Sequence, residues 1–186
     1  MQHSIDIGRF PWIRRLAVDY ALNYSSLAPF FAGDPSTPEA WRKAITRRHN
    51  LRPPSAFTEV LAAQQQSRGA PSEALAATEK LGRPDTVAIV TGQQAGLFGG
   101  PLFTLLKAVT AIKLARRLSQ EQSVPVVAVF WVDAEDHDWN EVASCAVLDA
   151  DCQVRRVVAE PPPGAGEMPV GSLKLGDGAS TAIDAI

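Results

Sequence analysis

The fold class follows from residues 86–101, Thr86-Val87-Ala88-Ile89-Val90-Thr91-Gly92-Gln93-Gln94-Ala95-Gly96-Leu97-Phe98-Gly99-Gly100-Pro101. Residues 86–91 are rich in β-branched side chains and lie between a proline and a glycine, which predicts a buried strand. Glycines dominate residues 92–100, and a helical pattern then runs from Pro101 to about Leu118. Residues 125–132 are apolar throughout, as in a strand covered on both faces of a parallel sheet. Strand, glycine turn, helix and strand predict a βαβ unit, whose crossover we expect to be right-handed.

Helices are predicted before this unit and a hairpin after it. Apolar spacing and breaker residues predict helices at residues 12–26, 36–52, 55–66 and 71–82. Two short β-rich runs, 143–148 and 153–158, predict the hairpin, and residues 170–175 predict the start of another strand. Proline and glycine make residues 160–166 a predicted linker or exposed loop. The expected fold is α/β, with a helical region (1–84), a core (85–160), and a linker with the start of a following segment (161–186).

Composition limits the classes of function. The chain has 186 residues, 46% hydrophobic and 20% charged, which is ordinary globular usage. Its net charge of −2 gives no general attraction to nucleic acid or to an anionic membrane. The start lacks an apolar signal region and no run reaches the ~18 apolar residues of a membrane span, so we expect a cytoplasmic protein with Cys145 and Cys152 reduced. Because Ile186 is followed by no polar tail, we also expect the chain to be truncated.

The glycine turn is a candidate ligand site. Glycines let the backbone approach a ligand closely, and the helix start beyond them suits phosphate or carboxylate. The adjacent glutamines, at the carboxyl end of a strand, would face the crevice where open α/β sheets bind ligands. The spacing matches neither GxGxxG nor a Walker A loop, so a tight turn capped by its glutamines is the alternative. The candidate cofactor-binding residues are Thr91, Gly92, Gln93, Gln94, Gly96 and Lys107.

Lys107 is the weaker member of that set. It belongs to a polar stripe on the predicted helix, which includes Thr104, Thr110, Lys113 and Arg117. Such a stripe is typical of a solvated face on a helix that covers a sheet. The alternative is that Lys107 reaches an anion near the helix start.

The second candidate site follows the apolar strand, in Asp133-Ala134-Glu135-Asp136-His137-Asp138-Trp139-Asn140-Glu141. Gathered carboxylates repel one another, so such a cluster usually meets protons, a cation or a cationic partner. Its carboxylates could hold Mg²⁺ bridged to a nucleotide phosphate, and its histidine could exchange protons near neutral pH. In the alternative interpretation Asp136 or Asp138 caps a short helix and the others face water. The only histidines are His3, His49 and His137, which argues against a dedicated zinc or non-haem iron site, and no metal ligand is assigned.

Together the two motifs resemble those of the bacillithiol-biosynthesis cysteine-adding family, the cysteine ligases. The first block of the resemblance is residues 91–102 with 107–115, and the second is residues 125–132 with 135–138. Residues 27–35 are a looser match, and the whole resemblance runs from about residue 10 to 160. Two departures are Gly99, where a larger residue such as threonine is expected, and the additional charge of Asp133.

The resemblance implies a Rossmann-like core, a coiled coil through which full-length members form homodimers, and ligation of L-cysteine to the amine of glucosaminyl-malate. It implies carboxylate activation, most simply by ATP with Mg²⁺. Gln93, Gln94 and Gly96 would line one wall of the crevice. The opposite wall would hold the candidate catalytic residues Glu135, Asp136, His137 and Asp138. Family members are several times longer, so we expect the chain alone to be inactive. The alternatives are another Mg²⁺-dependent nucleotide-binding transferase and a non-catalytic nucleotide-binding or interaction module.

Overall fold

The computed structural model describes residues 5–48 and 54–184, which leaves His3 and His49 outside the described residues. The chain divides into two compact units, residues 1–52 and 53–186. The first unit contains α1 (Arg15–Leu22), α2 (Pro38–Arg48) and short 3-10 turns. The predicted helix over residues 12–26 is therefore shorter, because Asn23 leaves the helical conformation at φ −140° and ψ 50°.

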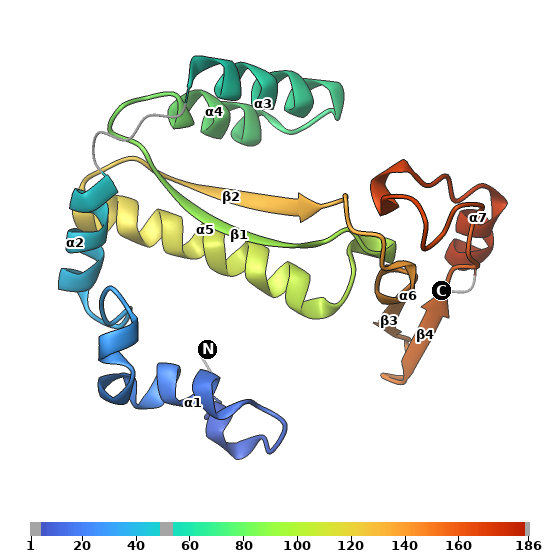
Figure 1. The fold of residues 1–186 in the computed structure, drawn as a ribbon, viewed down its shortest axis with the longest axis horizontal. Coiled ribbons are helices and arrows are strands. Elements are labelled where there is room, and N and C mark those ends of the chain that lie inside the picture. The colour runs from blue at the N-terminus through green and yellow to red at the C-terminus, as the bar shows by residue number, and fades with distance from the viewer. Residues whose placement is uncertain (1–4, 49–53, 185–186) are drawn as a thin grey trace. The chain divides into compact units, whose positions relative to one another are not determined.

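The second unit contains the predicted βαβ motif. Helices α3 (Ser55–Ser67) and α4 (Ser72–Leu81) pack against each other, and α4 contacts β2. Strand β1 (Val87–Gln94) pairs in parallel with β2 (Val126–Asp133), and α5 (Leu102–Gln122) connects them. Figure 1 shows α5 running alongside both strands, which it contacts. These elements confirm the predicted α/β fold, while the predicted domain boundary at residue 84 stays a prediction.

β1 extends three residues beyond the predicted strand. The pairing register runs to Gln93 opposite Val132 and Gln94 opposite Asp133, so both glutamines lie on the strand and not in the turn. Gly92 permits this continuation, because a Cβ at this position would lie only 2.7 Å from the carbonyl oxygen of Trp131. The absence of a side chain at Gly92 therefore lets β1 and β2 approach each other closely.

The prediction of strands covered on both faces is met only in part by the described residues, since Val127 is 5% exposed and α4 contacts β2 but other positions of the sheet are open. Helix α5 buries Ala111, Ala115 and Leu118. On the other face of the sheet, Val90 is 66% exposed and Trp131 is 65% exposed. The physical reason is that the described sheet has two strands and α5 packs along only one of its faces.

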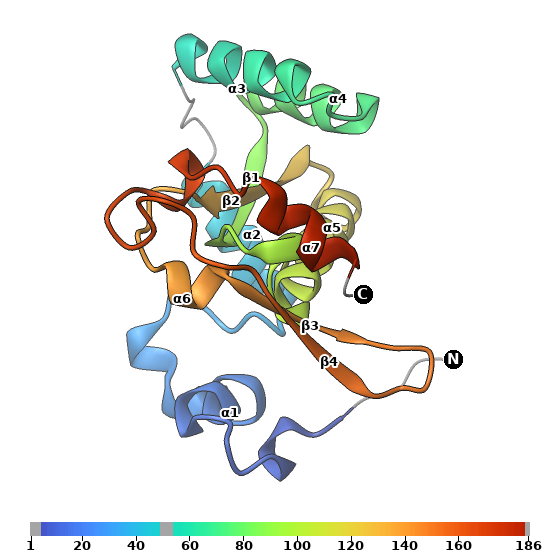
Figure 2. The ribbon, with the colours of Figure 1, turned by 90° about the vertical axis from the view of Figure 1, so that its right-hand side faces the viewer.

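The predicted hairpin is confirmed. β3 (Ser144–Leu148) pairs antiparallel with β4 (Val154–Val158), and Figure 2 shows the two strands as a separate ribbon. Asp149 fastens the turn, since its Oδ1 accepts the backbone N–H of Gln153 at 2.8 Å and its Oδ2 accepts Arg155 Nε at 2.8 Å. Cys145 of β3 is buried, Cys152 in the turn is exposed, and the two are not bonded to each other.

The segment after β4 folds back over the acidic loop. Instead of the strand predicted at residues 170–175, it forms a 3-10 turn (Val170–Ser172) followed by α7 (Asp177–Asp184). The Val170 N–H donates to the Asp136 carbonyl at 2.8 Å, and the Gly171 N–H donates to the Ala134 carbonyl at 2.7 Å. The N–H groups of this turn therefore bind loop carbonyls and not a strand. Among the described residues, no helix is both long and apolar enough to cross a membrane.

A small core holds these pieces together around α6 (Trp139–Val142). The side chain of Trp139 is 9% exposed and is the largest in the cluster. The cluster contains Trp139, Val142, Ala143 and Ala159, with Leu97, Ala165, Val170 and Leu173 packed against it. Because its members come from the glycine turn, α6 and the returning segment, the cluster fixes those three parts relative to one another.

Candidate functional site

A chain of hydrogen bonds joins the glutamines of β1 to the acidic cluster. Lys107 Nζ donates to Gln93 Oε1 at 2.7 Å, and Gln93 Nε2 donates to Gln94 Oε1 at 2.6 Å. Gln94 Nε2 donates to Glu141 Oε2 at 3.2 Å and lies 3.5 Å from Asp136 Oδ2. We call these five residues the glutamine bridge.

The parallel pairing explains why the bridge forms. Gln94 lies opposite Asp133, so the carboxyl ends of both strands meet at the sheet edge where α/β proteins bind ligands. Asp136 follows in the loop after β2, and Glu141 lies on α6. The structure thus brings both sequence motifs together in one site.

Asp136 is held as a carboxylate. Its Oδ1 accepts the backbone N–H of Asp138 at 3.1 Å. That hydrogen bond, with those from the His137 N–H and the Gln94 amide, lowers the pKa of Asp136 below its ordinary 3.8, although burial acts in the opposite direction. Hydrogen bonds to the ionised form favour that form. Asp136 is therefore charged at neutral pH and can accept a proton or face a cation.

The other predicted acidic-cluster residues lie outside the bridge. Asp138 is the N-cap of α6, where its Oδ1 accepts the Glu141 N–H at 3.1 Å. This confirms, for Asp138, the alternative interpretation of a helix cap. Glu135 and His137 are exposed. Catalytic roles for these three residues stay predictions.

Lys107 is exposed, as its polar stripe predicts, but its ammonium reaches back to β1. Besides Gln93, it donates to the Gly92 carbonyl at 3.2 Å and lies 5.1 Å from the centre of the Phe103 ring. Thr91 lines a shallow cavity between β1 and α5 together with Lys107. Contact of either residue with a cofactor stays a prediction.

The glycine turn is shaped by backbone conformations that favour glycine. Gly99 has φ +88° and Gly100 has φ +79°, and Phe98 adopts φ +52°. Gly99 is the position where the family resemblance suggested a larger residue, and its left-handed φ suits glycine. A Cβ on Gly96 would lie 2.8 Å from the Cα of Gly100, so the turn closes on itself.

Helix α5 begins directly after this turn. Its N-cap, Pro101, provides no side-chain hydrogen bond to the helix start. The buried hydroxyl of Thr104 also has no hydrogen-bond partner among the described residues. The Thr104 N–H donates to the Pro101 carbonyl at 2.8 Å, which leaves the N–H groups of Leu102 and Phe103, among the described residues, to suit an anion.

Glu141 belongs to the predicted acidic cluster but is not among the predicted catalytic residues, and the structure places it in the glutamine bridge. It lies five residues beyond Asp136, and the loop between them gives no periodic signal. The short α6 helix turns it back toward Gln94. The sequence signal that could have found it is the Asp138 cap, which places Glu141 at the third position of a helix.

A magnesium ion would need few protein ligands at this site. Among the described residues, no group of three or more His, Cys, Asp or Glu side chains is arranged to hold a metal ion. Mg²⁺ is commonly held by one or two carboxylates, with water and substrate phosphate completing its shell. Asp136 and Glu141, which share the Gln94 amide, fit that requirement.

The parallel β1–β2 pair, the glycine turn and α5 define a Rossmann-like α/β domain. Over residues 3–186 the chain matches the family described as "Bacillithiol biosynthesis BshC, N-terminal Rossmann-like domain", and it belongs to that family. The match confirms the resemblance found in residues 91–115 and 125–141.

Several curated relatives carry the name "Putative cysteine ligase BshC". The Salinibacter ruber protein is 37% identical over 182 residues, covering 96% of this chain and 32% of that protein. The Symbiobacterium thermophilum protein is 46% identical over 103 residues, covering 55% of this chain and 18% of that protein. The chain therefore spans about a third or less of the length of these relatives.

Proposed function

We propose that this chain supplies the nucleotide- and substrate-binding part of a ligase in bacillithiol biosynthesis. The reaction joins the carboxylate of L-cysteine to the amine of glucosaminyl-malate through an amide bond, with ATP as the activating co-substrate. The printed name of the relatives supports the ligase, and the glutamine bridge is the observation that supports the site. In the full-length protein we propose a homodimer, as the family resemblance implies.

The bridge suits the amine half of this reaction. An amine attacks only as its free base, so the site must take a proton from the ammonium form. Glu141 is the proton acceptor that we propose, and Asp136, whose hydrogen bonds keep it ionised, is the carboxylate that faces the ammonium group or Mg²⁺. Gln94 holds both through one amide group, and Lys107 orients that amide through Gln93.

The glycine turn suits the activating half. ATP, when bound, would supply the phosphoryl or nucleotidyl group that activates the cysteine carboxylate for attack by the amine. The N–H groups at the start of α5 would receive its phosphates, and Mg²⁺ held by Asp136 would neutralise the charge of those phosphates. An apolar pocket of about 300 Å³ beside the turn, lined by Leu97, Phe98 and Trp139 among others, offers space for the base.

The test uses the intact protein that the gene encodes, because the relatives are about three times longer than this chain. Purified protein is given L-cysteine, glucosaminyl-malate and ATP, and the amide product is measured by mass spectrometry. We expect Glu141→Gln to lower kcat by about 10²- to 10⁴-fold, the usual contribution of a general base, and Asp136→Asn to lower kcat as well. Glu121→Gln is the matched control, since Glu121 is exposed on α5 and forms an ion pair with Arg117.

The outcomes separate the competing functions. If product formation is unchanged in both variants, the assignment of Asp136 and Glu141 to the active site is wrong. ATP consumption without amide formation would favour another Mg²⁺-dependent transferase. Nucleotide binding without any turnover would favour a non-catalytic nucleotide-binding module.

A further inference from the structure

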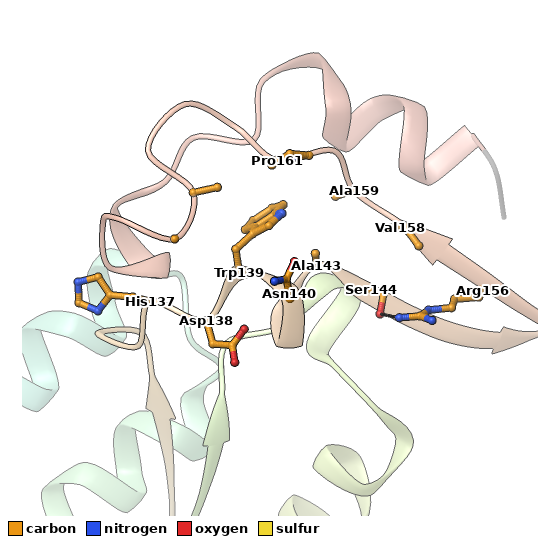
Figure 3. Close-up of a pocket in the computed structure, with 12 residues that line it drawn as sticks. His137, Asp138, Trp139, Asn140, Ala143, Ser144, Arg156, Val158, Ala159 and Pro161 are labelled. Carbon is orange, nitrogen blue, oxygen red and sulfur yellow. Dashed lines mark hydrogen bonds between the residues drawn. The ribbon is translucent and has the colours of Figure 1, made fainter.

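A second pocket lies beside the glutamine bridge, and its lining contains none of the five bridge residues. It has a volume of about 540 Å³, within the usual range for small-molecule sites. Figure 3 shows its lining, which comes from the loop before α6, α6 itself, the β3–β4 hairpin and the loop after β4. Its polar lining residues are His137, Asp138, Asn140, Ser144 and Arg156.

Arg156 gives this pocket a cationic end. Its Nη2 donates to Ser144 Oγ at 3.0 Å, which holds the guanidinium on the hairpin. The neighbouring Arg155 is ion-paired with Asp149 at 2.8 Å, whereas Arg156 has no carboxylate within 4.0 Å among the residues that the structure describes. A guanidinium has five N–H donors in a planar fork that matches a carboxylate, and most of them remain available here.

The other end of the pocket can accept hydrogen bonds from a ligand. His137 lies at the end of the labelled group opposite Arg156 in Figure 3. Asp138 lies next to it; its Oδ1 accepts the Glu141 N–H in the α6 cap, while its Oδ2 accepts no hydrogen bond from the residues that the structure describes. The pocket therefore fits a small molecule with a carboxylate at one end and an amine or hydroxyl toward the other.

We propose that this pocket binds the carboxylate-bearing part of the amine substrate, with Arg156 as the residue that recognises the carboxylate. This inference rests on the proposed ligase function, in which the amine substrate is an amino sugar joined to malate. Asp138 of the pocket lining and Asp136 of the glutamine bridge belong to the same loop, and we propose that the amine of a substrate held by Arg156 lies toward that loop. A nucleotide phosphate could satisfy the same guanidinium, and the experiment distinguishes the two anions.

Steady-state kinetics of the intact protein tests the proposal with Arg156→Gln. We expect its KM for glucosaminyl-malate to rise about 10- to 100-fold, as for loss of a charge-assisted bidentate pair, with the KM for L-cysteine and for ATP unchanged. Arg155→Gln is the matched control, because it removes the neighbouring charge and weakens the hairpin without touching the pocket lining. Equal effects of the two variants, or a rise confined to the KM for ATP, would overturn the proposal.

Calorimetric titration with L-malate separates this inference from the ligase function. Binding that is lost in Arg156→Gln but kept in Arg155→Gln supports the carboxylate site, even in a protein that forms no amide product. If Arg156→Gln still forms the amide with an unchanged KM for glucosaminyl-malate, the ligase function stands and the proposed role of this pocket is refuted.

Discussion

Replacing Gly92 by alanine will push β1 away from β2 at the point where the glutamine bridge begins. The new Cβ would lie 2.7 Å from the Trp131 carbonyl oxygen, so reaching the 3.4 Å of ordinary contact requires a shift of about 0.7 Å. No rotamer relieves this contact, because the clashing atom belongs to the backbone of the paired strand. Overpacking of this kind costs about 1–3 kcal/mol. Since a 1 Å misplacement of catalytic groups costs about 100-fold, we expect kcat/KM to fall by roughly 10- to 100-fold.

Gly82→Ala is the matched substitution. Its Cβ would lie 3.4 Å from the Glu79 carbonyl and 3.7 Å from Thr58, at an ordinary φ of −71°. We expect its stability to be unchanged or raised by about 0.4–1 kcal/mol. Urea unfolding and product formation are measured for both variants in the intact protein. Equal unfolding midpoints and equal kcat/KM for the two variants would refute the packing argument.

Three further predictions test other parts of the structure. Trp139→Ala removes the largest side chain of the buried cluster, and we expect about 3–5 kcal/mol of destabilisation in urea unfolding; a loss under about 1 kcal/mol would contradict its role. Lys107→Met should lower kcat about tenfold, since it removes the ammonium from the glutamine bridge, whereas Lys113→Met on the same helix should leave kcat unchanged. The Arg155 guanidinium and two backbone N–H groups hold the pKa of Asp149 below its ordinary 3.8, so its stabilisation of the hairpin is complete above about pH 4 and is lost as the pH falls through the lowered pKa. Asp149→Asn should therefore lower the melting temperature at pH 7 and should lower it less at pH 3, and an equal decrease at both values would be inconsistent with this pKa.

The βαβ unit could be predicted because its signals are local. An apolar run bounded by proline and glycine defines each strand, and the continuous pattern between them defines α5. The parallel arrangement then required the carboxyl ends of β1 and β2 to meet, so the proximity of Gln94 and Asp136 was also predictable. The hairpin followed from two β-rich runs around Asp149.

Other features depend on contacts between distant residues, which a single sequence does not encode locally. Residues 170–172 have the composition of a strand, but the N–H groups of Val170 and Gly171 bind carbonyls of the acidic loop. A Cβ on Gly171 would lie 2.8 Å from the Cβ of Ala134, so this docking depends on the absence of a side chain. Lys107 likewise has the spacing of a solvated stripe, and its hydrogen bonds to Gln93 and to the Gly92 carbonyl distinguish it from Lys113.

The central claim is that Gln94 and Glu141 act as one unit in amide formation. A double-mutant cycle on kcat/KM, with Gln94→Leu, Glu141→Gln and the combined variant in the intact protein, tests it most directly. If the 3.2 Å bond between them is what matters, the combined variant should lose about as much activity as the more damaged single variant, a coupling of roughly tenfold or more. Losses that simply multiply would show that the two side chains work independently, and the glutamine bridge would not be the working site.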